Sequence, residues 1–287
     1  MKHSHTYQFL DSGDGLKLER FGKYILARPC AQAVWRRRLP LNQWREADAS
    51  FSREPENTWH YAHKLPPEWV AELDGLSFKI MPTDFGHLGV FPEHHHLWLW
   101  VQDLIKKAVA KDKEELHVLN LFAYSGGASL AAARAGAHVC HLDASKGMVA
   151  WARENAALNN LDKAPIRWII DDVHKFLVRE SRRGKRYDGI ILDPPTFGRG
   201  AQGEIFKIER DLPALLESCK ELLVDDPLFV VLSCHTPGYS PLVMRHMMAQ
   251  MMGTTSGRIE EGEMVLEGKE DVLPLPSGTF ARWVKED

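Results

Sequence analysis

The sequence predicts an α/β fold with a seven-stranded, mostly parallel sheet and a small β-rich region at the N-terminus. Three observations predict it: four buried-strand patterns in succession, a glycine turn directly after the first of them, and two further strand patterns at the end of the chain. Strands that alternate with helices build a parallel sheet, because each helix returns the chain to the edge where it started. We place the boundary between the two regions after residue 75, which gives 1–75 and 76–287.

Bulk properties exclude several protein classes. The 287 residues carry a formal net charge of −3, so any nucleic-acid-binding face has to be local. Neither an apolar stretch of membrane-spanning length nor a signal-peptide pattern is visible, and we expect a cytoplasmic protein. The four cysteines are scattered and form no C-x-x-C pair, which argues against a zinc site or a disulfide framework: Cys30, Cys140, Cys219 and Cys234.

The first 65 residues read as irregular and turn-rich, with a turn cluster at 11–15. Hairpins are expected where two strand patterns flank a turn, at 17–21 with 24–28 around Gly22 and at 69–73 with 76–81 around Asp74-Gly75. The basic run Arg36-Arg37-Arg38 lies near Trp35 and Trp44. Such a segment can lie against RNA, although a solvated face with inward-packed aromatic rings is the more frequent arrangement.

The most informative segment is a strand followed by a glycine turn. Residues 117–122 form an apolar run, Ser125, Gly126 and Gly127 form the turn, and 128–135 are typical of a helix. This arrangement presents backbone N–H groups at the carboxyl edge of a sheet, where ligands of α/β sheets bind. The dinucleotide fingerprint G-x-G-x-x-G is absent, which argues against an NAD-dependent dehydrogenase. The turn favours a ligand without phosphates, and we expect S-adenosylmethionine (SAM).

Acidic residues end the next three strand patterns. Asp143 ends the strand at 138–143, at the spacing used to bind ribose hydroxyls. Asp172 follows the strand at 166–171 and can accept from the adenine amine, while the N–H of Val173 faces the ring. Asp143 and Asp172 can alternatively be ordinary helix caps, since Asp is common there. Asp193 ends the fourth strand, which starts at residue 187.

The remaining chain completes the predicted sheet. Before the four strand patterns, an amphipathic helix is expected at 97–110 under the sheet. After them, we expect a helix at 207–223, a fifth strand at 228–235, a Met-rich helix at 240–252, and strands at 262–268 and 279–284. The triplet His94-His95-His96 suggests a metal site at first sight. Consecutive residues of a helix cannot all face one ion, so we expect no metal.

Several of these segments resemble the class I SAM-dependent methyltransferases, whose sheet is Rossmann-like. They are Leu119-Asn-Leu-Phe-x-Tyr-x-Gly-x-Ala-Ser, Asp143-x-Ser145, Trp151-Ala152-x-x-Asn155, Asp171-Asp172-Val173 and Asp193-Pro-Pro-Thr-Phe197. Within that class, the sequence is most similar to bacterial enzymes that methylate large-subunit ribosomal RNA at cytosine C5 or guanine N7. The resemblance covers about residues 76–240. It does not extend to the RNA-binding PUA module of the cytosine enzymes, and Glu93-His94-His95 stands where the family usually has Asp-x-Arg.

The resemblance implies a set of binding residues and a ribosomal RNA substrate, with no membrane and no metal partner, and it leaves the oligomeric state open. Contacts to SAM are implied for Tyr124, Ser125, Gly126, Gly127, Asp143, Ala144, Ser145, Asp172, Val173 and Asp193. Contacts to the substrate are implied for Pro194, Pro195 and Phe197.

Two target bases are compatible with these motifs. The Asp193-Pro-Pro-Thr-Phe197 form is typical of guanine-N7 enzymes, whereas Ser233-Cys234 resembles the cysteine motif of cytosine-C5 enzymes. Cytosine C5 becomes nucleophilic only after a thiolate adds to C6, whereas guanine N7 needs only alignment. We favour cytosine C5, with Cys234 as nucleophile and Asp193 steadying the ring. Guanine N7, a non-RNA substrate and an inactive RNA-binding scaffold are the alternatives, and Cys234 can also be an apolar filler.

Overall fold

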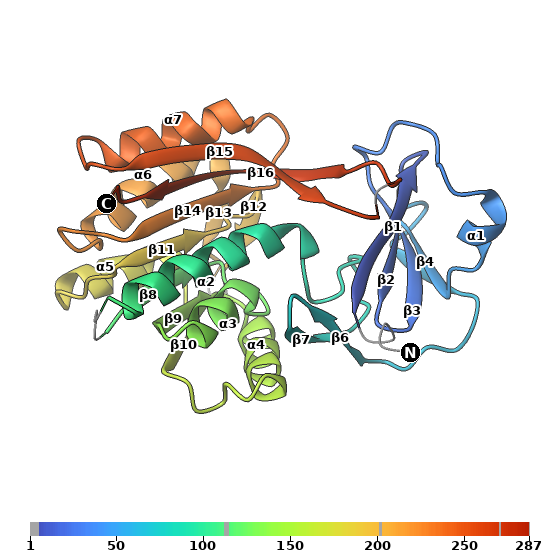
Figure 1. Cartoon of the computed structure of the whole chain (residues 1–287), viewed down its shortest axis with the longest axis horizontal. Coiled ribbons are helices and arrows are strands. Elements are labelled where there is room, and N and C mark those ends of the chain that lie inside the picture. The colour runs from blue at the N-terminus through green and yellow to red at the C-terminus, as the bar shows by residue number, and fades with distance from the viewer. Residues whose placement is uncertain (1–5, 112–114, 201–202, 270, 287) are drawn as a thin grey trace. The chain divides into compact units, whose positions relative to one another are not determined.

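The computed structural model describes residues 6–111, 115–200, 203–269 and 271–286, and the chain forms two compact units (Figure 1). The first unit contains Met1–His95 and Val265–Ser277. The second contains His96–Met264 and Gly278–Asp287. The boundary predicted after residue 75 lies inside the first unit.

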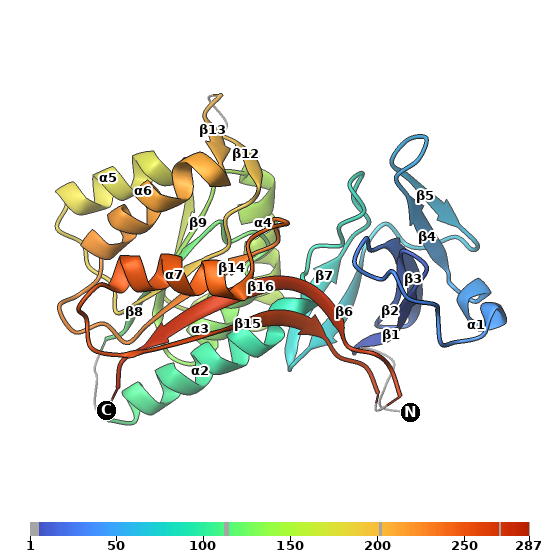
Figure 2. The same ribbon diagram turned by 90° about the horizontal axis from the view of Figure 1, so that it is seen from above.

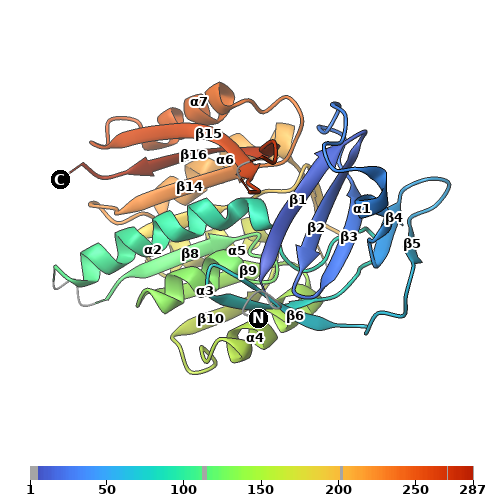
Figure 3. The same cartoon turned by 45° about the vertical axis from the view of Figure 1, so that its right-hand side comes forward.

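The first unit is built on a five-stranded sheet in the order β1-β2-β3-β4-β5 (Figure 3). Its elements are β1 (Tyr7–Gly13), β2 (Leu16–Phe21), β3 (Tyr24–Pro29), α1 (Leu41–Arg45), β4 (Ala49–Ser52), β5 (Thr58–Tyr61), the separate hairpin β6 (Trp69–Leu73) and β7 (Leu76–Ile80), and the 3₁₀ turn η1 (Pro92–His94). Neighbouring strands are antiparallel except β3 and β4. Both predicted hairpins are confirmed.

The prediction that the first 65 residues are irregular is wrong, and so is most of the turn cluster at 11–15. β1 runs through Asp11 and Ser12, and only Asp14-Gly15 forms the turn. Asp11 is 2% exposed because its carboxylate accepts from the backbone of Arg38 and Leu39 and from the indole of Trp44. A polar residue can therefore lie inside when its hydrogen bonds are satisfied, which composition does not reveal.

The second unit contains the predicted seven-stranded sheet, in the order β10-β9-β8-β11-β14-β16-β15 (Figure 1). The strands are β8 (His117–Leu121), β9 (His138–Asp143), β10 (Ile166–Ile170), β11 (Gly189–Leu192), β14 (Phe229–Cys234), β15 (Arg258–Leu266) and β16 (Leu275–Val284). The first five of these in the sheet order are parallel, and β16 is antiparallel to β14. The predicted fold class is confirmed.

Helices cover both faces of this sheet. One face carries α2 (His95–Val109) and α3 (Gly127–Arg134), and the other carries α5 (Val173–Arg182), α6 (Ile208–Glu221) and α7 (Pro241–Met252), as Figure 2 shows. The remaining helix, α4 (Lys146–Leu158), contacts β9 and β10.

The strands are apolar throughout because both faces are covered. Leu119 packs towards α5–α7 and its neighbour Val118 towards α2 and α3. None of the helices in the described ranges is long and apolar enough to cross a membrane.

Candidate functional site

The loop between β8 and α3 has an unusual backbone. Phe122, Tyr124 and Gly126 all have positive φ angles, of 54°, 50° and 95°. Left-handed backbone is costly for residues with a side chain and persists only where the surroundings enforce it. Here Ala123 donates its N–H to Leu142 on β9, and Gly126 donates to Ala123. The loop is thus held in one shape before any ligand binds.

Both glycines of the turn are required by close packing. A Cβ on Gly126 would lie 3.1 Å from the Cβ of Ala152 in α4. A Cβ on Gly127 would lie 2.3 Å from Cζ2 of Trp98 in α2, which is a severe clash. These glycines let α2 and α4 approach the N-terminus of α3, whose first N–H groups have no acceptor within the helix.

Asp143 connects this loop to the next one. Its Oδ2 accepts from the N–H of Tyr124 at 2.9 Å, and its Oδ1 accepts from the N–H of Ser145 at 2.8 Å. Ser145, and not Asp143, caps α4. Burial raises the pKa of Asp143, although both backbone hydrogen bonds act to lower it. A carboxylate has about four lone-pair sites, so two bonds leave acceptor capacity for a diol.

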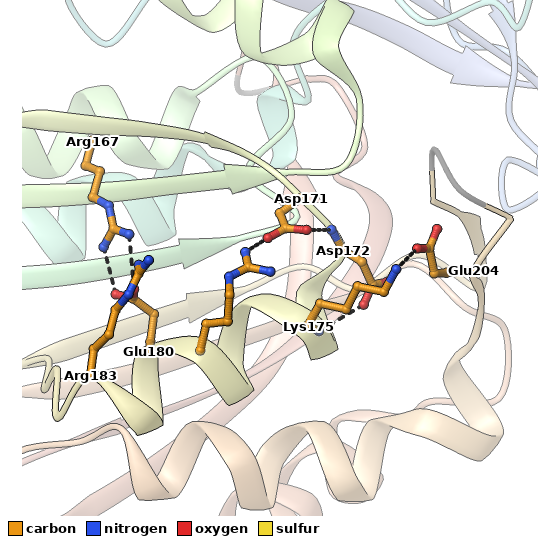
Figure 4. A network of polar contacts seen from close by, with 8 residues as sticks. Arg167, Asp171, Asp172, Lys175, Glu180, Arg183 and Glu204 are labelled. Carbon is orange, nitrogen blue, oxygen red and sulfur yellow. Dashed lines mark hydrogen bonds and ion pairs between the residues drawn. The ribbon is translucent and has the colours of Figure 1, made fainter.

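Asp172 is the N-cap of α5, as the alternative interpretation held. Its carboxylate accepts from the N–H of Lys175 at 3.0 Å, and the N–H of Val173 is the first of the helix. The adjacent Asp171 forms an ion pair with Arg179. It also accepts from the N–H of Asp172, as Figure 4 shows. The cap fixes the direction of the Asp172 side chain, which remains at the carboxyl edge of β10.

Asp193 follows β11 and is oriented by the neighbouring strand. The hydroxyl of Ser233, on β14, donates to Oδ1 of Asp193 at 2.8 Å, and Nδ1 of His235 lies 3.5 Å from the same oxygen. Neither Ser233 nor His235 was expected from the sequence to orient Asp193. They could have been found only from the register that pairs Leu192 with Leu232, since this register sets Ser233 beside Asp193.

The segment after Asp193 leads to a small hairpin. Pro194 is buried and Pro195 is exposed, and the hydroxyls of Thr196 and Thr236 lie 2.7 Å apart. The hairpin consists of β12 (Phe197–Arg199) and β13 (Ile205–Lys207). The ring of Phe197 is 47% exposed and is available for stacking.

Cys234 does not lie at this surface. It is 1% exposed, belongs to the apolar cluster under α6 and α7, and its Sγ accepts from the N–H of Thr236 at 3.3 Å. Burial raises the pKa of the thiol. Neighbouring strand residues point to opposite faces, which explains why Ser233 reaches Asp193 and Cys234 does not.

The other proposed site residues share one location, the carboxyl ends of four adjacent parallel strands. Hydrogen bonds bring Tyr124, Asp143 and Ser145 together, and Ala144 lies between the last two in the chain. Asp172 and Asp193 follow strands on either side of this pair of loops. Three carboxylates in succession along one edge favour a positively charged ligand.

Comparison with known proteins identifies the family of the chain. The family described as "S-adenosylmethionine-dependent methyltransferase" matches residues 29–249. The "Ribosomal RNA large subunit methyltransferase K/L" of Shewanella sp. (strain ANA-3) is 35% identical over 211 residues, which are 71% of this chain and 27% of that protein. The chain thus spans about a quarter of the length of the curated relatives it matches.

Solved structures extend the similarity to the whole chain. A "SAM Dependent Methyltransferase from Agrobacterium tumefaciens" has a TM-score of 0.92 and 40% sequence identity, covering 99% of this chain and 92% of that one. The methyltransferase SMU.776, solved in complex with SAH, has a TM-score of 0.75 at 20% identity, covering 99% of this chain and 76% of that one.

Proposed function

Because the chain belongs to the S-adenosylmethionine-dependent methyltransferase family, we propose that it methylates a base of RNA. It is an enzyme, and its cofactor is SAM. The RNA substrate is supported by the Shewanella relatives, whose names give ribosomal RNA as their substrate. We extend that substrate class to this chain as a proposal, since it covers only part of those proteins.

The acidic residues of the carboxyl edge suit SAM in charge. When bound, the cofactor supplies a methyl group on a positively charged sulfur. In the proposed site, Asp143 accepts from the ribose hydroxyls, while Ala144 and Ser145 line the same side. Asp172 and the N–H of Val173 bind the adenine. The preformed loop Tyr124–Gly127 and the carboxylate of Asp193 enclose the methionine part, and the acidic edge stabilises its positive charge.

The substrate base is proposed to bind beside Asp193. Ser233 holds the carboxylate of Asp193 in one orientation, so it can accept from an N–H of the base edge. The carbonyls of Pro194 and Pro195 have restricted positions because the proline rings fix φ. Phe197 supplies a stacking face for an unstacked base, a contact worth about 1–3 kcal/mol.

The burial of Cys234 is the observation that favours guanine N7 over cytosine C5. A thiolate nucleophile must reach the base and be deprotonated near neutral pH, and burial opposes both. Guanine N7 is already a nucleophile and asks only for alignment with the methyl group. We therefore favour direct transfer to a ring nitrogen and keep cytosine C5 as the alternative that the sequence motif suggests.

The test is Cys234→Ala, assayed on ribosomal RNA with isotope-labelled SAM. Direct transfer predicts that this variant keeps its rate within about twofold of the Cys219→Ala control, which removes another buried thiol from α6. Loss of transfer with unchanged SAM affinity would instead establish the covalent cytosine route. If the unmodified protein methylates no RNA, the RNA assignment is wrong.

A further inference from the structure

A second candidate surface lies in the same unit, at the opposite edge of the sheet. A cavity of about 610 Å³ opens where the parallel strands begin, which is within the usual range for ligand pockets. We call it the amino-edge cavity. Residues with polar or aromatic side chains that line it include His117, His138, Arg167, Lys185, Arg186 and Tyr187.

The rim of the cavity is formed by a short, strongly basic segment. Arg182 is the last residue of α5, residues 183–186 follow it, and all five are exposed. Gly184, Lys185 and Arg186 line the cavity itself. Gly184 has a φ of 64°, which lets the chain turn directly after the helix. We call residues 182–186 the basic loop. It places four positive charges within five residues in a chain whose net charge is −3.

A buried carboxylate anchors this loop. Arg167 donates to both oxygens of Glu180, at 2.8 and 3.0 Å, and Arg183 and the hydroxyl of Tyr187 donate to Glu180 as well. Figure 4 shows both arginines converging on it. Burial acts to raise the pKa of Glu180, but these hydrogen bonds outweigh it and lower the pKa. Glu180 therefore stays ionised and holds Arg167 and Arg183 in place.

The other cations of the loop are not neutralised in this way. Nearer the start of α5, Lys175 pairs with Glu204 and Arg179 pairs with Asp171. Within the ranges that the structure describes, no carboxylate forms an ion pair with Arg182, Lys185 or Arg186.

Positive charge also exceeds negative charge around the cavity as a whole. Among the described residues that line the cavity, three are cations, Arg167, Lys185 and Arg186, and none is an acid. Clustered charge of one sign attracts a partner of the opposite sign.

We propose that the amino-edge cavity and the basic loop bind the phosphate backbone of the RNA, an inference that rests on RNA being the substrate. The guanidinium groups of Arg182 and Arg186 suit phosphate because each offers a planar fork of donors. The rings of His117 and His138, 5.3 Å apart, give the cavity an aromatic wall for an unstacked base.

The position of the surface predicts a dependence on RNA length. A strand of five residues rises about 17 Å, so the two edges of the sheet are about that far apart. An oligonucleotide of a few residues bound at the carboxyl edge cannot reach the basic loop. A folded RNA domain can contact both, so the basic loop contributes affinity only for the larger substrate.

The test compares two variants that each remove three positive charges. Arg182→Gln/Lys185→Gln/Arg186→Gln changes the proposed surface, and Arg153→Gln/Arg258→Gln/Lys285→Gln changes exposed cations elsewhere in the unit. Binding of a folded ribosomal RNA fragment is measured over a salt series. Each lost phosphate contact makes the negative slope of log K against log salt shallower by about 0.7–0.9. The first variant lacks three cations, so its slope should be shallower by about 2–3. Its affinity should fall at least tenfold, with SAM affinity and thermal unfolding unchanged.

An unchanged salt slope, or an equal loss in both triple variants, would overturn the proposal. If the first variant does not fold, Lys185→Gln alone should still lower the slope by about 0.7–0.9. Binding is read separately from methyl transfer, so the two proposals fail separately. A protein that binds RNA through the basic loop without methylating it refutes only the proposed function. If the unmodified protein binds no RNA, both are wrong.

Discussion

The two edges of the parallel sheet carry opposite charges. At the carboxyl edge, the strands end in Asp143, Asp172 and Asp193, and at the amino edge the same strands begin next to Arg167 and the basic loop. Strand interiors are fixed by packing, whereas the loops at their two ends are free to differ. One sheet can therefore offer a site for a cationic cofactor at one edge and a surface for a polyanion at the other.

The two edges also differ in how their charges are held. Each carboxylate at the carboxyl edge accepts from a backbone N–H or a neighbouring hydroxyl, which leaves it little freedom. Among the described residues of the amino edge, Arg167 and Arg183 bind the buried Glu180, whereas the other cations of the basic loop are on long, exposed side chains. Fixed groups suit a small ligand of defined shape, and mobile cations suit a polymer that binds in many registers.

The largest expected effect is on SAM affinity, after a substitution that changes the carboxyl edge alone. Asp143→Ala would remove the two charge-assisted hydrogen bonds that we propose it accepts from the ribose, each worth about 1.5–3 kcal/mol. SAM affinity measured by calorimetry should therefore fall at least about a hundredfold. The matched control, Asp162→Ala, removes an exposed carboxylate from the loop before β10 and should leave SAM affinity unchanged. Equal affinities for the two variants would remove Asp143 from the cofactor site.

The second largest effect is on the free energy of unfolding, after a substitution of Glu180, which anchors the basic loop at the amino edge. Glu180→Gln retains the shape but removes the charge that Arg167 and Arg183 share, which should lower the free energy of unfolding by about 1–2 kcal/mol. Urea denaturation compares this variant with Glu217→Gln, an exposed position of α6. SAM affinity at the carboxyl edge should stay the same. A change in SAM affinity would show that the two edges are coupled.

The smallest effect near neutral pH is on the pH dependence of stability, and it comes from a buried histidine in the middle of the sheet. His141, on β9, is buried, and its Nδ1 bonds to the hydroxyl of Ser129. Burial lowers the pKa of His141 to about 3, below its ordinary value of about 6.5. The neutral ring is favoured in the folded state, so its contribution to stability is complete above pH 6.5 and is lost as the pH falls towards 3.

The stability measurement that checks this is urea unfolding between pH 7 and pH 5. Below pH 6.5, the protonation of His141 should lower the free energy of unfolding by up to about 1.4 kcal/mol for each unit that the pH falls. His141→Gln should reduce that pH dependence, whereas substitution of the exposed His246 in α7 should not. An identical pH dependence in the two variants would contradict the assignment.

Most of the second unit was predictable because its strands are buried on both faces. Apolar runs such as residues 117–122 and 228–235 stand out, and a terminal strand pair completes the sheet. In the sheet of the first unit only the β2–β3 hairpin was predicted, since β4 and β5 are short and β1 contains the buried Asp11. Only long-range contacts decide that such a polar residue lies inside.

The site was predictable where its residues follow one another in the chain. The glycine loop and the acids after each strand could be named from sequence position alone. Ser233 and Glu180 could not, because their partners are 40 and 13 residues away and meet them only through the packing of the sheet and α5. The orientation of Cys234 depends on which face of β14 it occupies, and an apolar strand gives no alternation to read.

The chain passes between its two compact units three times, after residues 95, 264 and 277. The first unit is therefore not a detachable N-terminal extension. In it, Leu266 and Leu275, from near the C-terminus, pack in one apolar cluster with Phe9 and Ala33. Leu266 and Leu275 are fully buried in the complete chain. A truncated protein that starts at residue 96 would keep both leucines but lose the residues that cover them. Exposed strand ends of this kind promote aggregation. Expression trials aimed at a minimal catalytic fragment have to remove residues 265–277 together with the first 95, or keep both.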